Sequence, residues 1–100
     1  EEPFGPLVPV LTFKDFDEVV ERANNNDLGL CSYLYTNSMD RANRASEMME
    51  TGCVAVNTAA VAVAEAPFGG IKQTGYGREG GSMAIKDYLN VKYTHMGLKT

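Results

Sequence analysis

The segment Leu30-Cys31-Ser32-Tyr33-Leu34-Tyr35-Thr36 predicts an extended strand in the first half of this 100-residue chain. Tyrosine recurs in it, and aromatic side chains are typical of strands. One helical pattern precedes this strand and a second one follows it. Residues 30–36 are therefore predicted to be a strand that lies between two helices in the chain.

The helix before the strand is predicted to be capped by Asp15, because Glu18 stands three residues later and completes a capping box. Glu18 is also spaced to pair with Arg22, one turn further on. Apolar residues recur at helical spacing and give this helix one apolar face: Phe16, Val19, Val20 and Ala23. The polar run over residues 24–27 and the following Gly29 end the helix.

The helix after the strand is predicted to be capped by Asn37 or Ser38. Asp40 and Arg44 are spaced to pair across one turn, and Gly52 supplies a left-handed stop. The inward side chains are expected to be Met39, Ala42, Ala45, Met48 and Met49. Residues 53–58 then predict another strand. Near its end stands an amide, Asn57, which is suited to tie down the loop that follows.

A further strand over residues 7–13, with Pro9 favouring a sheet edge, completes a β-α-β-α-β order. Short connections between alternating strands and helices indicate an α/β layer with a mainly parallel sheet. Residues 58–81 form a long glycine-rich loop, which in a compact domain is typically functional.

The chain after this loop is predicted to form a short helix, capped by Ser82 and ending at Leu89, and then a terminal strand from Val91 to Met96. We therefore expect one domain over residues 1–90, followed by a strand and tail over residues 91–100.

Composition narrows the class of protein. The chain is 44% hydrophobic with a net charge of −4, which argues against disorder and against nucleic-acid binding. No apolar run is long enough to span a membrane, and no signal peptide stands at the start. The chain begins without Met, as if cut from something longer. Cys31 and Cys53 are expected to be reduced, buried thiols of a cytoplasmic protein, and the lone His95 gives neither of them a catalytic base.

Three motifs suggest a site. Glu2 and Phe4 lie two positions apart in a proline-rich start, and in an extended chain they would share one side and could touch one ligand. The residues alone favour the alternative, a strained turn with a solvated Glu2. Phe68, fixed between proline and glycines, is suited to wall a small-ligand site or to plug the core. The run over residues 75–80 matches G-x-G-x-x-G but lacks the strand before it that a phosphate loop requires. Its Arg78 and Glu79 are instead expected to make local or intersubunit hydrogen bonds.

Four segments occur in an order and at spacings that fit one family: Glu1–Pro6, Asn26–Leu30, Gly52–Asn57 and Pro67–Gly80. Together they resemble the aldehyde dehydrogenase superfamily over essentially all 100 residues. Residues 85–93 are most similar to its succinate-semialdehyde branch. The resemblance implies that this chain is the C-terminal part of that family's α/β catalytic domain.

The resemblance also implies roles for single residues. Glu2 would hydrogen-bond the nicotinamide ribose of NAD or NADP, Phe4 would contact the nicotinamide ring, and Phe68 would border the aldehyde substrate. Val91 to Met96 would join an intersubunit sheet of a homodimer or homotetramer. The family's cysteine nucleophile, glutamate base and oxyanion-hole asparagine would lie outside this segment.

The leading hypothesis is thus a segment of an NAD(P)-dependent enzyme that oxidises an aldehyde, such as succinic semialdehyde, to an acid through a cysteine thioester. The isolated chain is expected to be inactive. Ala62 stands where the semialdehyde branch commonly has a serine, which departs from that branch. The alternatives are a non-catalytic α/β interaction module that uses residues 91–96 as an exposed edge, and, less favoured, a nucleotide-binding domain built on residues 75–80.

Overall fold

The fold consists of short elements separated by long irregular segments in the computed structural model, which describes residues 2–99. In chain order they are α1 (Phe16–Asn24), β1 (Leu28–Gly29), β2 (Cys31–Leu34), α2 (Met39–Met48), β3 (Cys53–Val56), β4 (Ile71–Lys72) and the 3-10 helix η1 (Ala84–Tyr88). In the described residues no helix is long and apolar enough to cross a membrane.

Helix α1 begins as its capping residues predict. The Asp15 carboxylate accepts a hydrogen bond from the Glu18 amide at 2.9 Å. The returning half of the box is displaced by one residue, because the Glu18 carboxylate accepts from the Lys14 amide rather than from Asp15. Glu18 also pairs with Arg22 at 3.2 Å, as expected from their spacing.

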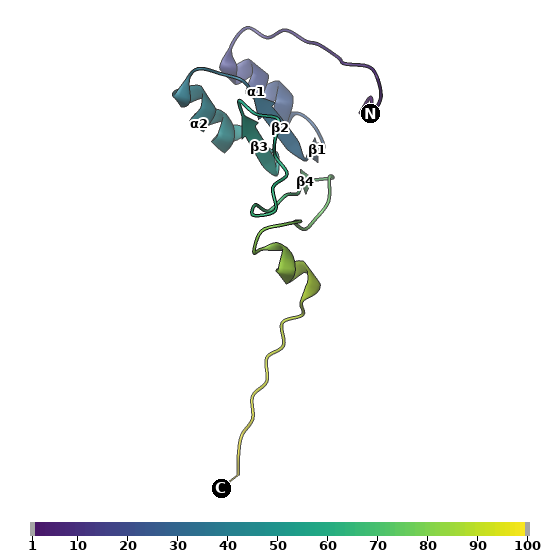
Figure 1. Cartoon of the computed structure of the whole chain (residues 1–100), viewed down its shortest axis with the longest axis vertical. Helices are drawn as coiled ribbons and strands as arrows, with labels where there is room; N and C mark the ends of the chain where they lie inside the picture. Colours follow the sequence, from purple (N-terminus) through teal and green to yellow (C-terminus); the bar gives the residue numbers. More distant parts are fainter. Residues whose placement is uncertain (1, 100) are drawn as a thin grey trace.

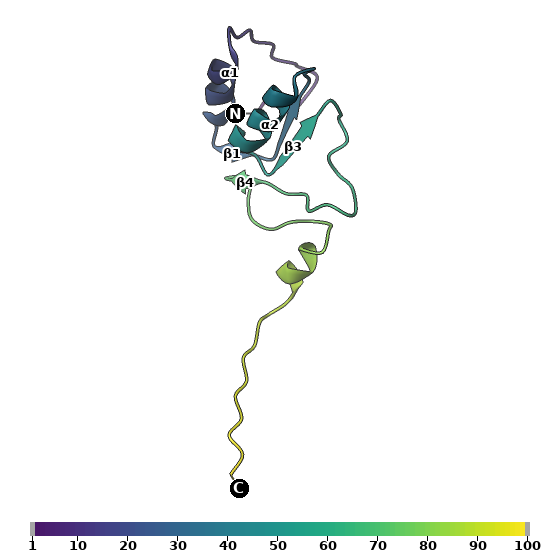
Figure 2. The ribbon, with the colours of Figure 1, turned by 90° about the vertical axis from the view of Figure 1, so that its left-hand side faces the viewer.

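Strands β2 and β3 form the parallel pair that the sequence predicts, with α2 as the crossover between them (Figure 1). The register places Cys31 opposite Cys53 and Leu34 opposite Val56. Ser38 caps α2 by accepting a hydrogen bond from the Arg41 amide. This β2–α2–β3 unit is the best-formed part of the fold, and α1 and α2 contact each other beside it (Figure 2).

The prediction of one mainly parallel sheet is wrong in its extent. Strand β1 pairs with β4 in the antiparallel sense, so the described residues hold two separate two-stranded sheets. This second pair has only two rungs, Leu28 with Lys72 and Gly29 with Ile71. It brings the glycine-rich loop back against the end of α1.

Residues 7–13 do not form the predicted first strand. They are an exposed arm that arcs away from the helices, and no other described segment lies alongside to pair with it (Figure 1). Pro9 adds to this, because it has no amide to donate to a sheet. Residues 7–13 are apolar and favour strands, but they stay unpaired because no strand of the described chain lies beside them.

Two local predictions about α2 are also wrong. Arg44 pairs with Asp17 of α1 at 2.8 Å and lies over the Phe16 ring at 4.5 Å, and so does not pair with Asp40. Gly52 is not in the left-handed region. It is a glycine because a Cβ there would overlap the Gly69 carbonyl oxygen, which packs directly against it.

The C-terminal part departs from the prediction as well. The predicted helix after Ser82 is a single 3-10 segment, η1, and no side chain caps it. Residues 91–99 continue as an extended tail that pairs with no strand of the described chain (Figure 2). A strand over Val91–Met96 would therefore need a partner from elsewhere.

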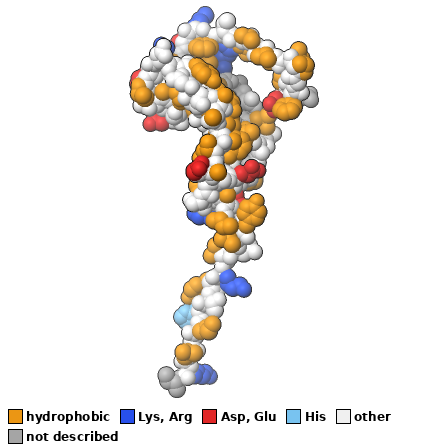
Figure 3. Space-filling model, viewed as in Figure 1, with side chains coloured by type: hydrophobic (Ala, Val, Ile, Leu, Met, Phe, Trp, Pro, Cys, Tyr) orange, Lys and Arg blue, Asp and Glu red, His pale blue; other side chains and the backbone are white. Residues whose placement is uncertain are grey.

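Little of the apolar surface is buried. The buried hydrophobic residues of the described chain are Val20, Ala42, Ala45 and Ala55. Met39, expected to point inward, is 75% exposed. Hydrophobic side chains lie along the N-terminal arm and down the tail (Figure 3). The radius of gyration is 19.2 Å, against about 13 Å for a compact domain of this length.

Candidate functional site

A hollow that includes Glu2 lies beside the end of α1. Glu2 and Pro3 line it together with the segment over residues 25–32, which holds the Asn-Asn-Asp turn and β1. Gln73 and Thr74, just after β4, line it as well. We call this the Glu2 hollow. The structure therefore brings Glu2 and Pro3 against a turn more than twenty positions away.

Phe4 does not share this hollow with Glu2. The Phe4 amide donates a hydrogen bond to the Glu2 carbonyl at 2.9 Å, so the chain turns at Pro3 instead of running straight. The turn that the residues alone favoured is therefore confirmed, and the alternative of an extended start with both side chains on one side is wrong. Phe4 is 95% exposed.

A second hollow includes Phe68, whose ring is half-buried. Its amide and carbonyl exchange 2.7 Å hydrogen bonds with those of Glu79, which closes residues 68–79 into a loop. Residues 74–79, Asp87 and Tyr88 line the same space. We call it the Phe68 hollow. Pairing with Glu79 thus holds Phe68 on its loop, and its role as a wall of a ligand site stays a prediction.

The G-x-G-x-x-G run lines the Phe68 hollow and precedes no regular helix that could hold a phosphate. Gly77 has a φ of 93°, which glycine adopts without strain. The Arg78 guanidinium donates to the Gly70 and Gly77 carbonyls at 2.8 Å, and its amide donates to Asp87. These bonds confirm the local role expected of Arg78.

Leu30 and Thr74 line both hollows, so the Glu2 and Phe68 hollows meet at the β1–β4 pair. The Thr74 hydroxyl accepts a hydrogen bond from the Gly29 amide at 2.8 Å. Any molecule that spans the two hollows would pass these residues. The sequence offers one signal for Leu30 and Thr74. Each lies in one of the family motifs, Asn26–Leu30 and Pro67–Gly80, and the fold brings these two motifs together.

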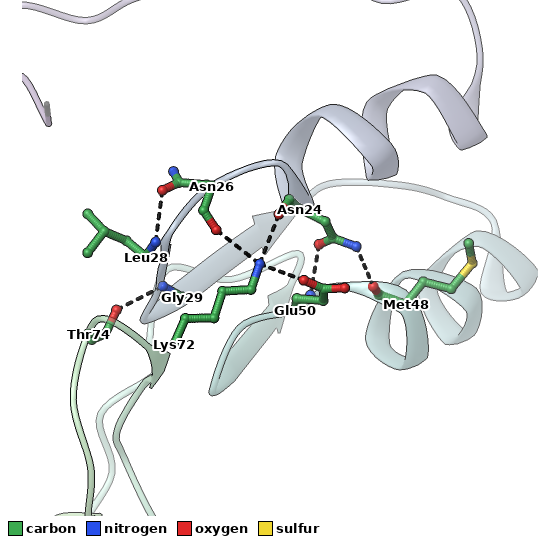
Figure 4. A network of polar contacts seen from close by, with 8 residues as sticks. All are labelled: Asn24, Asn26, Leu28, Gly29, Met48, Glu50, Lys72 and Thr74. Atoms are coloured by element: carbon green, nitrogen blue, oxygen red, sulfur yellow. Dashed lines mark hydrogen bonds and ion pairs between the residues drawn. The ribbon is translucent and has the colours of Figure 1, made fainter.

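Lys72 is the residue that ties the loop to the helices (Figure 4). Its ammonium donates to the Asn24 and Asn26 carbonyls at 2.8 and 3.0 Å and pairs with Glu50 at 2.5 Å. A cation at the last carbonyls of α1 also complements the helix dipole. Lys72 has a φ of 56°, unusual for a residue with a side chain, which these contacts hold in place.

Asn24 completes this network from the other side. Its side chain donates to the Met48 carbonyl at the end of α2 and accepts from the Glu50 amide, both at 2.8 Å. Polar contacts thereby join the ends of both helices to β4, within the glycine-rich loop. Sequence reasoning gave no role to Lys72 or Asn24, because their partners are distant in the chain.

The two thiols are half-buried, so the prediction of fully buried cysteines is wrong in degree. Cys31 lines the Glu2 hollow, and Cys53 lies 3.7 Å from the Gly69 carbonyl. Partial burial, and then the neighbouring Cys53, raise the pKa of Cys31. The raised pKa lowers the fraction of Cys31 that is thiolate at neutral pH, which slows its reactions without preventing them. Among residues 2–99 no group of three or more His, Cys, Asp or Glu side chains is placed to hold a metal.

The chain is similar to known proteins over nearly its whole length. The model of the aldehyde dehydrogenase family matches residues 1–94. The 3-sulfolactaldehyde dehydrogenase of Pseudomonas putida is 54% identical over 97% of this chain, and the NADP(+) succinate-semialdehyde dehydrogenase of Escherichia coli is 46% identical over 98%. The NAD+ complex of a Bacillus cereus aldehyde dehydrogenase superposes on 92% of the chain and 19% of its own, with 43% identity and a TM-score of 0.88.

The chain therefore belongs to the aldehyde dehydrogenase family. It has the α/β fold of the matching part of these enzymes. The chain spans about a fifth of the length of the curated relatives it matches.

Proposed function

We propose that this chain is the C-terminal segment of an NAD(P)-dependent dehydrogenase that oxidises an aldehyde to a carboxylic acid. The observation that carries the proposal is the match of nearly the whole chain, at 54% identity, to one fifth of an aldehyde dehydrogenase. Both curated relatives described above act on aldehydes that bear a second, acidic group. We therefore propose an acid-bearing aldehyde, such as succinic semialdehyde, as the substrate class.

The exposed apolar surface supports a segment rather than a self-standing module. Phe13 of the arm, Ile85 of η1 and Leu98 of the tail are all more than half exposed. A chain that served alone as a binding module would leave these surfaces in water, at a cost that grows with their area. In the proposed enzyme they pack against the remainder of the catalytic domain or a second subunit.

Roles within the proposed enzyme follow the family motifs. Glu2 accepts hydrogen bonds from the nicotinamide ribose, Phe4 packs on the nicotinamide, and Phe68 borders the aldehyde. A carboxylate suits the hydroxyls of a ribose, and the exposed ring of Phe4 suits a flat heterocycle, although the two residues do not share one hollow. Val91–Met96 pairs with a strand of another subunit in a homodimer or homotetramer.

The chemistry in the proposed enzyme uses a cysteine thiolate outside this segment. That thiolate would add to the aldehyde, and water would hydrolyse the thioester that remains after oxidation. NAD(P)+ supplies the hydride acceptor when bound. The residues of this chain bind and orient the cofactor and the substrate, and Cys31 and Cys53 take no part. We place the enzyme in the cytoplasm, where free thiols stay reduced.

A hybrid enzyme tests the proposal. Residues 1–97 replace the matching segment of the Escherichia coli succinate-semialdehyde dehydrogenase, and NAD(P)H formation is followed with succinic semialdehyde. We expect the hybrid to turn over and the isolated 100-residue chain to form no NAD(P)H. A hybrid that assembles like its parent but is inactive would contradict the proposal, and so would turnover by the isolated chain.

A further inference from the structure

Cys31 and Cys53 are the first residues of adjacent parallel strands and stand directly opposite each other. In a sheet, residues in one register position project from the same face, and the face alternates at each step along the strand. The two thiols therefore share one face of the β2–β3 pair. Their neighbours Ser32 and Val54 project from the opposite face.

The spacing of the strands suits a covalent bond between the two sulfurs. Neighbouring strands lie about 4.8 Å apart, and disulfides form where the Cα atoms are roughly 4.4–6.8 Å apart. The backbone of β2 and β3 therefore already holds the two residues at bonding range. Closure also requires the two Cβ atoms to come within about 3.5–4.5 Å, so the strand starts draw together slightly while the side-chain torsions change.

The environment of each thiol differs. Cys31 borders the Glu2 hollow, which a small molecule can enter. The Cys53 thiol instead points to the Gly69 carbonyl, 3.7 Å away, next to Phe68. Cys31 is thus the thiol that meets a reagent first, and Cys53 is the one placed to resolve the product.

We propose that Cys31 and Cys53 form a dithiol site that a low-molecular-weight disulfide converts into a cross-strand disulfide. The Cys31 thiolate attacks one sulfur of the reagent and breaks its S–S bond, which releases one small thiol. The Cys53 thiolate then attacks Cys31 in the mixed disulfide and releases the second small thiol. Two protein thiols lose two electrons and two protons, and the reagent takes up both.

Closing this bond alters the loop that carries Phe68. The Cys53 sulfur lies 3.7 Å from the Gly69 carbonyl, and bonding to Cys31 would change this contact. Gly69 follows Phe68 in the chain, and its carbonyl also packs against Gly52. The oxidation state of the pair is therefore coupled to the position of the Phe68 loop. This inference stands on the strand register and does not depend on the proposed enzyme activity.

The test equilibrates the 100-residue chain, at low concentration, with mixtures of oxidised and reduced glutathione. Closure is measured by intact mass and by mapping the linked peptides. The matched control combines Cys31→Ser with Ser32→Cys, which moves the thiol to the opposite face while keeping nearly the same loop length. A chain without strand register would close both variants equally.

We expect the natural pair to close with an equilibrium constant at least roughly tenfold larger than the control, because the folded strands hold the thiols together. We also expect this difference to vanish in guanidinium chloride. Equal closure of the two variants without denaturant would overturn the proposal. Accumulation of only mixed disulfides or of linked dimers would overturn it too.

Discussion

The side-chain amide of Asn57 pairs with both backbone polar groups of Thr36. The Thr36 amide donates to Asn57 Oδ1 at 2.8 Å, and Asn57 Nδ2 donates to the Thr36 carbonyl at 2.9 Å. Asn57 thereby extends the β2–β3 pairing by one rung beyond Val56, with a side chain in place of a backbone. The sequence suggested that Asn57 ties down the loop after β3. It instead holds the chain just after β2.

Replacing this amide should destabilise the parallel pair. We expect Asn57→Ala to lower the free energy of unfolding by about 2 kcal/mol, since two hydrogen bonds are lost and alanine is strained at a φ of 56°. Urea denaturation followed by circular dichroism measures the change. Asn37→Ala, at an exposed position just before α2, is the control and should change stability little. Equal effects of the two substitutions would refute the role of Asn57.

Gly52 should tolerate no side chain. A Cβ at this position would overlap the Gly69 carbonyl oxygen and approach the Gly69 carbonyl carbon at 2.8 Å. Because the neighbour is backbone, we expect Gly52→Ala to cost about 3 kcal/mol or more and to displace the Phe68 loop. Gly5→Ala, where nothing lies within 4 Å, should be neutral. Hydrogen exchange of residues 68–79 reports the displacement, and unchanged protection there would count against it.

Lys72 should stabilise the contact between loop and helices through its charge. We expect Lys72→Met to cost about 2 kcal/mol, because two helix-end carbonyls and the Glu50 carboxylate lose their donor. The difference from the unmodified chain should shrink in concentrated NaCl, since Glu50 is half exposed. Lys86→Met, at an exposed position of η1, is the control. A Lys72 effect that salt leaves unchanged would point to packing instead of charge.

The raised pKa of Cys31 predicts a pH dependence of stability. A thiol that is harder to ionise in the folded chain contributes stability below its ordinary pKa of 9.0 and loses it as the pH rises through the higher folded value. We expect the urea midpoint to fall as the pH is raised above 9.0. Cys31→Ser should flatten this fall, although the raised pKa of Tyr33 leaves a part of it. A midpoint that rises with pH in this window would contradict the assignment.

Glu2 and Phe68 should affect different substrates in the hybrid enzyme. We expect Glu2→Gln to raise the KM for NAD(P)+ about tenfold, equivalent to one hydrogen bond to a charged group, with little effect on the KM for aldehyde. Phe68→Ala should do the reverse. Glu65→Gln, on the exposed loop, is the control for a lost carboxylate. Equal changes in both KM values would mean that neither residue contacts its assigned ligand.

Local rules predicted the local features of this chain well. The N-cap of α1, the Ser38 cap of α2 and the parallel β2–β3 pair depend on residues close in sequence. The roles toward a ligand that the family motifs give to Glu2 and Phe68 stay predictions. The contacts that decide the two caps and the β2–β3 pair span no more than one supersecondary unit.

The features that sequence reasoning missed depend on distant partners. Arg44 chooses Asp17 of another helix over Asp40 of its own, and Lys72 finds carbonyls almost fifty positions away. Residues 7–13 have the composition of a strand but no partner strand to pair with. Composition reports what a segment prefers, whereas pairing depends on what the rest of the fold places beside it.

The two strand pairs differ in how firmly they close the chain. The β2–β3 pair joins Cys31 to Cys53 over four rungs, whereas the β1–β4 pair joins Leu28 to Lys72 over two. The second pair closes a longer loop with fewer bonds, so it has the smaller free energy of local opening. We therefore expect amide protons of residues 71 and 72 to exchange well before those of β3. The loop that carries Phe68 would then detach and return repeatedly while the β2–α2–β3 unit stays folded.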